Sequence, residues 1–229
     1  MNITLCSAFR NSTPYLARYF NQINDLDYAL HSQGHKLQLV WGEGDSSDGT
    51  LTMLKGAQFR FRAQLVDCTH GGAEHGSVVS AERFRQLAHV GNTILQAVPE
   101  ETDALLWVES DLIWHPATLL GLLNRLSVYP AVCPKILLKR AGWPAYTWYD
   151  TWAFRLDGKH FDHRRPYHPA HDGVSILRID SGGSCMAIRG ELAQKVSFPE
   201  EDVFVGLSRQ LYEHGGSLWL DPTISVTHT

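Results

Sequence analysis

Apolar residues in this chain of 229 residues follow two patterns, short continuous runs and longer runs with helical spacing. Strand-like runs occupy residues 2–8, 36–42, 61–68 and 103–110 in the first half. Helical patterns start at 13 and at about 51, and cover 81–98 and 116 to about 127. This alternation predicts an α/β domain with a mostly parallel central sheet and helices on both faces. In such sheets, ligands bind at the carboxyl ends of the strands.

Two local signals refine these elements. Thr13 is the expected N-cap of the first helix, because Pro14 then takes the first helical position. The run ALLWV within 103–110 is wholly apolar, which is typical of a parallel strand buried on both faces.

The second half of the chain is less regular. Residues 135–171 are rich in Trp, Tyr, Pro, His and Arg and hold only short strand-like pieces such as YTWYDTWAF, which is typical of an insertion that builds a pocket. Further strands are predicted at 173–179, 183–189 and 217–228, with a helix around 201–214. We find no internal repeat or low-complexity linker, so residues 1–229 are expected to form one domain.

Composition narrows the class of protein. With 44% hydrophobic and 19% charged residues the chain is expected to fold as a globule, and its net charge of −4 gives no overall basic field for a polyanion or a membrane surface. No run approaches the roughly twenty apolar residues of a membrane span, and the start MNITLCSAFRN does not resemble a secretion signal. Four widely spaced cysteines without a CxxC pair are typical of buried thiols in a reducing compartment. We therefore expect a cytoplasmic protein without a membrane span, and no protein partner can be inferred.

The fourth strand ends in an acidic triplet, Glu109-Ser110-Asp111. Because side chains alternate along a strand, Glu109 and Asp111 are expected on the same side of the chain where it leaves the sheet. Two carboxylates in this position can hold Mg²⁺ or Mn²⁺. A solvated turn is the ordinary alternative, but the position directly after a buried strand favours a metal site.

A second acidic turn, EGDSSDGT from Glu43 to Thr50, follows the second strand. It fits a plain turn with a helix cap. It also fits a nucleotide site, in which a carboxylate accepts hydrogen bonds from a ribose or base and small residues allow close approach to the backbone.

Five segments together resemble one family. WVESD is similar to the DxD-type metal motif of GT-A-fold glycosyltransferases, and EGDSSDGT resembles the acid-rich turn of family-two members. GGSCMAIRGEL resembles the glycine-bearing acceptor-side strand, PEEDVF the Glu-Asp pair at a helix start, and GGSLWLDPTISVTH the closing strand with its histidine. The resemblance covers nearly the whole chain in the expected order, which makes it more specific than any one motif.

The resemblance implies a GT-A (Rossmann-like) enzyme that moves a sugar from a nucleoside diphosphate sugar to a hydroxyl. Residues 1–130 would bind the nucleotide sugar, and residues 131–229 would bind the acceptor. By position in the motifs, the implied donor-binding residues are Ala8, Phe9, Arg10, Glu43, Asp48, Glu109 and Ser110, with Asp48 supporting its turn. The implied metal ligands are Asp111, His228 and Glu109, although a frayed tail is the alternative for His228. Asp202, or Glu201 or Glu200 beside it, would be the catalytic base.

Chemistry supports these roles. A cation at Asp111 and His228 would offset the charge that develops on the leaving diphosphate, and a carboxylate on the opposite side of the sugar would take the acceptor proton. That arrangement favours inversion. No QxxRW motif is present, which argues against a processive polysaccharide synthase.

The segment 135–171 carries seven Lys or Arg and three Asp, so it holds +4 and leaves −8 on the remainder. Aromatic faces beside cations suit stacking on sugars or bases and contact with phosphate. The ordinary alternative is that these rings build a core and the arginines are solvated. The predicted acceptor-binding residues are Trp143, Trp148, Trp152, Gly182, Gly183, Arg164 and Arg165. The histidines at 160, 163, 168 and 171 lack the spacing of a zinc site and suit hydrogen bonds to acceptor hydroxyls.

Several acceptors remain open. Segregated positive charge and stacking residues suit a hydroxymethylated pyrimidine in DNA, whereas a glycan, a lipid precursor or a protein would suit other members of the family. A sugar-nucleotide nucleotidyltransferase is an alternative of another class, but SAFRNSTPY lacks the glycine-rich basic loop it needs. A non-catalytic nucleotide-sugar-binding module is a third alternative, which an unchanged activity of Asp202→Asn would favour.

Overall fold

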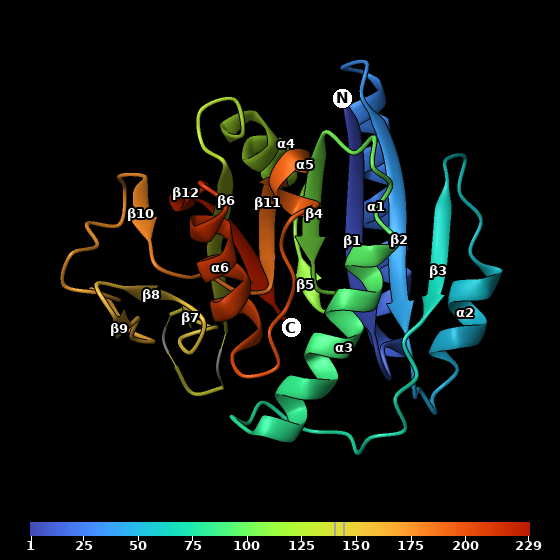
Figure 1. Ribbon diagram of the computed structural model, residues 1–229, viewed down its shortest axis with the longest axis horizontal. Helices are drawn as coiled ribbons and strands as arrows, with labels where there is room; N and C mark the ends of the chain where they lie inside the picture. The colour runs from blue at the N-terminus through green and yellow to red at the C-terminus, as the bar shows by residue number, and fades with distance from the viewer. Residues whose placement is uncertain (140, 144) are drawn as a thin grey trace.

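The computed structural model describes residues 1–139, 141–143 and 145–229; Arg140, one of the cations counted above, lies outside these ranges. Four parallel strands form the first half of the central sheet, in the order β3-β2-β1-β4. They span Asn2–Phe9 (β1), Lys36–Glu43 (β2), Ala63–Asp67 (β3) and Ala104–Val108 (β4). Their carboxyl ends meet at the lower edge in Figure 1.

The second half of the sheet has mixed directions. Strand β11 is antiparallel to both β4 and β6, and β12 runs parallel to β6. The carboxyl ends of β4, β6 and β12 therefore share one edge with the beginning of β11. The strands are β6 (Ala131–Leu138), β10 (Leu177–Ile179), β11 (Cys185–Arg189) and β12 (Leu218–His228), with short β5 (Leu112–Ile113) and β7 (Thr147–Trp148) on β12 and β6.

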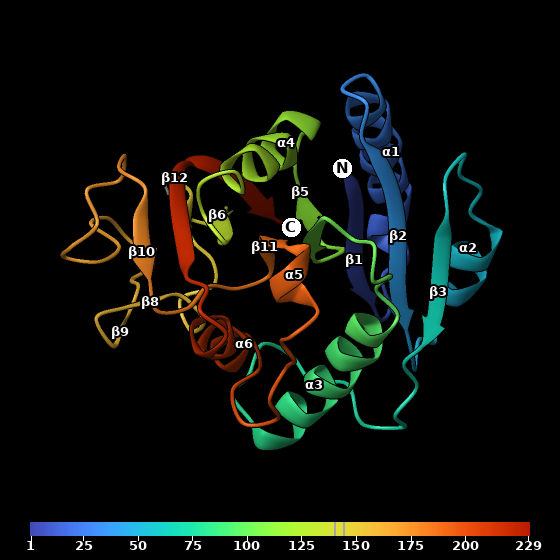
Figure 2. The same ribbon diagram turned by 45° about the horizontal axis from the view of Figure 1, so that its top comes forward.

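Helices cover both faces of the sheet, as the sequence predicts. Helices α1 (Thr13–His31) and α4 (Pro116–Arg125) lie on one face, and α3 (Ala81–Gln96) and α6 (Val203–Glu213) lie on the other, as the two views in Figures 1 and 2 agree. The short helices α2 (Thr50–Gly56) and α5 (Gly190–Ala193) complete the set. Because both faces are covered, sheet residues such as Leu5, Leu39 and Leu106 are fully or almost fully buried.

One carboxylate joins the starts of two helices. Asp48 accepts hydrogen bonds from the backbone N–H of Thr13 at 3.0 Å and of Thr50 at 3.0 Å. Helix α1 begins at Thr13, so its N-cap is Ser12, one residue before the expected position. The first backbone N–H of α1 is therefore capped by a side chain from a different loop, and not by its own N-cap residue.

The irregular segment starts later than the sequence suggests. Strand β6 extends to Leu138, where it pairs with His228 of β12, so residues 135–138 belong to the central sheet. Pro134 lies inside β6, and the register of β12 shifts after Asp221, which faces it. A proline in a run argues against a sheet strand, and the adjacent irregularity is what accommodates it.

Beyond β6, the segment folds over the lower left of the sheet in Figure 1 and contains the hairpin of β8 (Arg155–Leu156) and β9 (Lys159–His160). Its centre is an aromatic cluster around Trp148, which is fully buried and contacts Phe154 and Phe161 at ring-centroid distances of 4.9 Å. Over the ranges described, no helix is long and apolar enough for a membrane crossing. All four cysteines are buried free thiols.

Candidate functional site

A cavity of about 370 Å³ opens at the carboxyl ends of β1, β2 and β4. We call it the first cavity. Its walls come from the end of β1 and the residue after it, from Gly44 after β2, and from the acidic triplet after β4. Of the predicted donor-binding residues, the structure places Ala8, Phe9, Arg10, Glu109 and Ser110 here, together with the predicted metal ligands Asp111 and His228.

Asp111 and His228 lie side by side in this cavity. Nε2 of His228 is 2.9 Å from Oδ2 of Asp111. The other polar atoms, Oδ1 of Asp111 and Nδ1 of His228, are buried and have no hydrogen-bond partner within the described ranges. Buried polar atoms normally have partners, so this pair is chemically incomplete as it stands.

Strand pairing brings these two residues together. His228 ends β12 and is paired with Leu112 of β5, which directly follows Asp111. The backbone N–H and the hydroxyl of Thr229 also donate hydrogen bonds to the carbonyl oxygen of Asp111, at 3.2 and 2.8 Å. Tyr149 covers the imidazole of His228, with ring centroids 3.7 Å apart. The histidine is therefore held by a sheet and not in a frayed tail.

The pair fits a divalent cation that also binds a diphosphate. Mg²⁺ usually takes one or two carboxylates and fills its remaining positions with phosphate oxygens and water, and imidazole is an accepted ligand of transition metals. No cluster of three or more His, Cys, Asp or Glu side chains arranged for a metal ion occurs among the residues described. The protein alone thus offers too few ligands, and a bound phosphate would supply the others.

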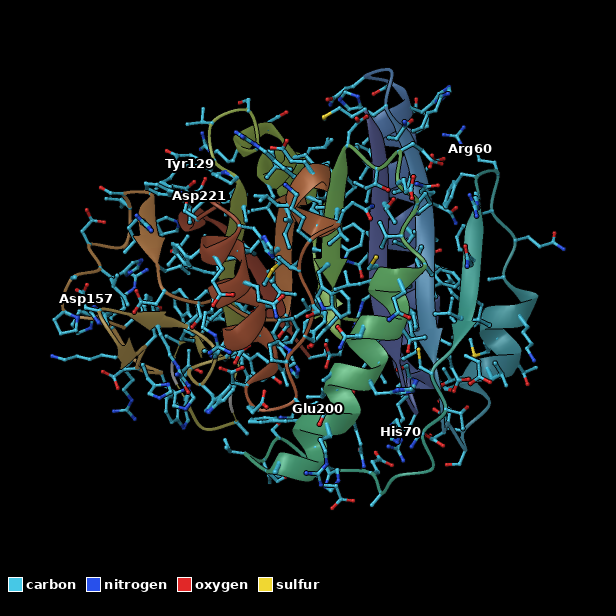
Figure 3. The ribbon with its side chains drawn as sticks, in the orientation of Figure 1. Arg60, His70, Tyr129, Asp157, Glu200 and Asp221 are labelled. Carbon is cyan, nitrogen blue, oxygen red and sulfur yellow. The ribbon has the colours of Figure 1, made fainter. Side chains whose placement is uncertain are left out.

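A loop over residues 69–80 covers the first cavity. It follows β3 at the lower edge of the sheet, where Figure 3 labels His70. Arg10 donates to the carbonyl oxygens of Gly72 at 2.9 Å and Ala73 at 3.2 Å. Asp45 accepts from the backbone N–H of His70 at 3.0 Å and of Gly71 at 3.1 Å, and these hydrogen bonds lower the pKa of Asp45. Both contacts tie the loop to the ends of β1 and β2.

Two residues predicted to serve the donor lie outside the cavity. Glu43 is buried and accepts a hydrogen bond from the backbone N–H of Ser46 at 3.2 Å, so its carboxylate closes the turn, and Gly44 is the residue that faces the cavity. Asp48 caps the two helices described above and supports its turn. Burial alone would raise the pKa of Asp48, but hydrogen bonds from Thr50 and Thr13 outweigh this and lower it to about 2.

A second cavity, of about 320 Å³, adjoins the first. The two share the walls formed by Glu109 and Tyr149, among others. The rings of Phe84, Trp152 and Phe204 form the apolar part of its wall, and polar side chains form the rest. Trp152, a predicted acceptor-binding residue, packs on Phe84 with ring centroids 4.8 Å apart. A cavity that combines aromatic walls with polar groups, next to another cavity, is suited to binding a second molecule.

Two carboxylates are among the polar groups of the second cavity. Asp150 lies here beside Glu109, and both side chains remain partly accessible from the cavity. Burial raises the pKa of Glu109, and the nearby carboxylates of Asp111 and Asp150 raise it further. Burial also raises the pKa of Asp150, against hydrogen bonds from Ala153 and Ser184 that lower it. Arg83, at the start of α3, faces both cavities and partly offsets this negative charge.

The predicted bases do not enter either cavity. Asp202 forms an ion pair with Arg209, with 2.7 Å between Oδ2 and Nη1, and Glu201 is exposed. Glu200 is also exposed, and Figure 3 shows it in the loop before α6. The next two residues, Val203 and Phe204, line the second cavity, whereas Asp202 does not.

The predicted acceptor-binding residues separate into three groups. Trp148 is fully buried in the aromatic cluster and Gly182 is buried against Cys133 and Leu218, so neither is accessible to an acceptor, contrary to expectation. Gly183 touches Asp150, since a Cβ at this position would lie 1.8 Å from Oδ2 of Asp150. Arg164 and Arg165 are exposed cations that lie over the rings of Trp143 and Tyr167, at 4.5 and 5.8 Å from the centroids.

Sequence reasoning missed three residues of the site, Arg83, Tyr149 and Asp150. Arg83 is in the first turn of a helix that follows a strand. Such turns lie at the same sheet edge as the strand ends, so the sequence pattern could have predicted Arg83 near the site. Tyr149 and Asp150 lie within the aromatic run YTWYDTWAF. Because aromatic residues dominate this run, its single carboxylate gives no separate signal in the sequence.

Comparisons with known proteins give structural matches only. No family model matches the chain, and no curated protein matches it. Among solved structures, S. aureus TarS 1-349 in complex with UDP matches with a TM-score of 0.60 at 14% identity, over 100% of this chain and 60% of that one. The UDP-GlcNAc complex of TarS 1-349 gives 0.57 at 14% identity, over 100% and 58%. GalNAc-T7 with UDP, GalNAc and Mn²⁺ gives 0.57 at 11% identity, over 100% and 44%.

The chain thus spans about 60% or less of the length of these structures. All of them are matched over the whole of this chain. In parallel α/β sheets, ligands bind at the carboxyl ends of the strands, which is where the first cavity lies. The chain has the fold of the GT-A glycosyltransferases.

Proposed function

We propose that the protein is a glycosyltransferase that uses a divalent cation and a UDP-sugar. The observation that carries this proposal is the pair Asp111 and His228. Both line a cavity at the carboxyl ends of the sheet, and their remaining polar atoms are buried and have no hydrogen-bond partner among the described residues. The choice of UDP and Mn²⁺ follows the structures with the same fold, which contain UDP, UDP-GlcNAc, or UDP with Mn²⁺.

In this proposal Asp111 and His228 hold the cation, and Tyr149 and Thr229 keep the imidazole and the strand end in place. When bound, the cation supplies positive charge that stabilises the departing diphosphate. Ala8, Phe9 and Gly44 form the wall for the nucleoside.

The arrangement of the cavities supports inversion. Asp111 and His228 line the first cavity, whereas the rings of Phe84 and Trp152 line the second. The two cavities meet at Glu109 and Tyr149. An acceptor in the second cavity would approach a sugar at this junction from the side away from the diphosphate. We therefore propose a single displacement that inverts the anomeric centre, which the anomeric configuration of the product, measured by NMR, would test.

We propose two classes of acceptor, modified DNA and a glycan or lipid precursor. Exposed cations stacked on aromatic rings at Arg164 and Arg165 favour an anionic polymer such as DNA carrying a hydroxymethylated pyrimidine. The rings of Trp152 and Phe84 in the second cavity would suit the apolar face of a sugar ring in a glycan or lipid precursor equally well. Adding hydroxymethylated DNA or a glycan panel to the assay below and measuring which one increases UDP release separates the two. Four buried free thiols support the proposed cytoplasmic location.

The test compares Asp111→Asn with wild type and with Asp157→Asn. Asp157 lies in the turn between β8 and β9, at the far left of Figure 3, and serves as a matched control outside both cavities. We expect wild type and the control to bind Mn²⁺ and UDP together by calorimetry and to release UDP from a UDP-sugar. Asp111→Asn should weaken Mn²⁺ binding by at least about tenfold. The absence of Mn²⁺ and UDP binding by wild type, or equal binding by Asp111→Asn, would refute the proposal.

A further inference from the structure

The second cavity contains a carboxylate that the resemblance does not account for. Asp150 lies two residues after the short strand β7. It lines the second cavity but not the first. On the basis of the proposed function, we propose that Asp150, and not Asp202, accepts the proton of the acceptor hydroxyl.

The carboxylate of Asp150 is held in a fixed orientation. Its Oδ1 accepts a hydrogen bond from the backbone N–H of Ala153 at 3.2 Å, and its Oδ2 accepts one from the hydroxyl of Ser184 at 3.3 Å. Gly183 leaves the space that Oδ2 occupies, since any larger residue there would collide with it. A carboxylate has about four acceptor positions, so lone pairs remain for a substrate hydroxyl beside the hydrogen bonds from Ala153 and Ser184.

The position relative to the cation pair is suitable for a base. Glu109 and Tyr149 separate Asp150 from Asp111 and His228, because these two residues border both cavities. A sugar at the junction would therefore have the cation pair on one side and Asp150 on the other. This is the arrangement required for displacement from the side opposite the leaving group.

The other carboxylates are less suitable. Asp202 is paired with Arg209, and it does not line the second cavity, although the next residues, Val203 and Phe204, do. Glu109 borders the first cavity next to Asp111, where a bound cation would attract its charge and keep it from acting as a base.

The step balances as follows. The acceptor oxygen forms a bond to the anomeric carbon while its proton moves to Asp150. The bond between the anomeric carbon and the diphosphate oxygen breaks, and its electron pair leaves with UDP. Asp150 later returns the proton to water, and no oxidant or further reactant is needed.

The experiment measures UDP release and UDP binding in the same set of full-length variants. UDP-sugars are incubated with Mn²⁺ and with water as the acceptor, so that no natural acceptor is required. The set is Asp150→Asn, Ser184→Ala, Asp202→Asn and the control Asp157→Asn. In Asp150→Asn the amide oxygen can still accept the hydrogen bond from the backbone N–H of Ala153, and the amide NH2 can donate to the hydroxyl of Ser184. Circular dichroism confirms that each variant is folded.

We expect Asp150→Asn to lower kcat at least about 100-fold, the lower range for loss of a general base, while the Kd for UDP stays within about twofold. Ser184→Ala should give a smaller loss of kcat with the same Kd, because it only loosens the carboxylate. Asp202→Asn should release UDP within about threefold of wild type. The assignment is overturned if Asp150→Asn keeps wild-type release, or if Asp202→Asn is the variant that loses it. Failure of wild type to bind UDP at all would instead refute the proposed function, and the assignment with it.

Discussion

The ring of Tyr149 stacks on the imidazole of His228, with centroids 3.7 Å apart and planes inclined by 22°. Tyr149 comes from the irregular segment and His228 from the last strand of the sheet, so this contact joins the two halves of the site. It restricts rotation of the imidazole and shields one face from water, which fixes the direction of the ring nitrogens that would bind a cation.

Replacing this ring tests its role. Tyr149→Ala should weaken Mn²⁺ binding by roughly twofold to tenfold, since an aromatic pair contributes about 0.5–1.5 kcal/mol. Tyr149→Phe keeps the stack and should bind as wild type does. Titration with Mn²⁺ followed by electron paramagnetic resonance measures both, and equal losses in the two variants would show that the hydroxyl matters and the stack does not.

The low pKa of Asp48 predicts that the stability of the protein depends on pH. Its pKa of about 2 lies below the value of about 3.9 for an unfolded aspartate, so its contribution is complete above about pH 4 and disappears as the pH falls towards 2. Asp48→Ala should lower the free energy of unfolding at pH 7 by about 1 kcal/mol, the usual effect of a lost helix cap, and less at high salt because the side chain is exposed.

The difference between wild type and Asp48→Ala should therefore shrink when urea unfolding is repeated at pH 5, 3 and 2. Asp25→Asn, an exposed carboxylate on α1, is the control and should show no comparable loss at pH 7. A difference that is constant with pH would contradict the role of the charge at Asp48.

Trp148 is expected to affect stability and not acceptor binding. It is fully buried among Phe154, Phe161 and Tyr167, so Trp148→Ala should lower the free energy of unfolding by about 3–5 kcal/mol. Trp143→Ala removes a partly exposed ring under Arg164 and should cost about 1 kcal/mol or less. Chemical denaturation of both variants gives the comparison, and a loss for Trp148→Ala no larger than for Trp143→Ala would contradict this core position.

Asp45 should control the loop over the first cavity. Asp45→Ala removes the acceptor for the backbone N–H groups of His70 and Gly71 and should raise the KM for the UDP-sugar about twofold to tenfold. The same change should speed proteolytic cleavage within residues 69–80. Asp45→Asn retains an acceptor oxygen and tolerates the backbone φ of 60°, so its effects should be smaller. Unchanged KM and cleavage in Asp45→Ala would show that the loop is held by other contacts.

Most of the sheet could be predicted because its strands and helices have clear local patterns. The predicted N-cap of α1 differs from the observed one by one residue. The first N–H of the helix is capped by Asp48 from another loop, and capping rules that use only neighbouring residues cannot detect this. Strand β6 was missed because Pro134 interrupts it, and the irregularity that accommodates this proline lies in β12.

Site residues that belong to a sequence motif could be predicted, whereas residues that reach the site only through tertiary packing could not. The acidic triplet and His228 were expected together from the resemblance, and the structure places Asp111 and His228 in contact, although their roles as ligands remain predictions. Asp150 could not be found in this way. It approaches the site through Ser184, which precedes an antiparallel strand, whereas ligand rules direct attention to the residues that follow parallel strands.

The shared cap at Asp48 has a consequence for anion binding. In many nucleotide-binding sheets the phosphates rest on free N–H groups at the first turn of a helix. Here Thr13 donates to Asp48, residue 14 is a proline and Tyr15 donates to the carbonyl oxygen of Ser12, so this turn of α1 has no donor left. With the carboxylate of Asp48 at this helix start, α1 offers no anion site in its first turn. Under the proposed function, the charge of a diphosphate would therefore have to be offset by the cation at Asp111 and His228.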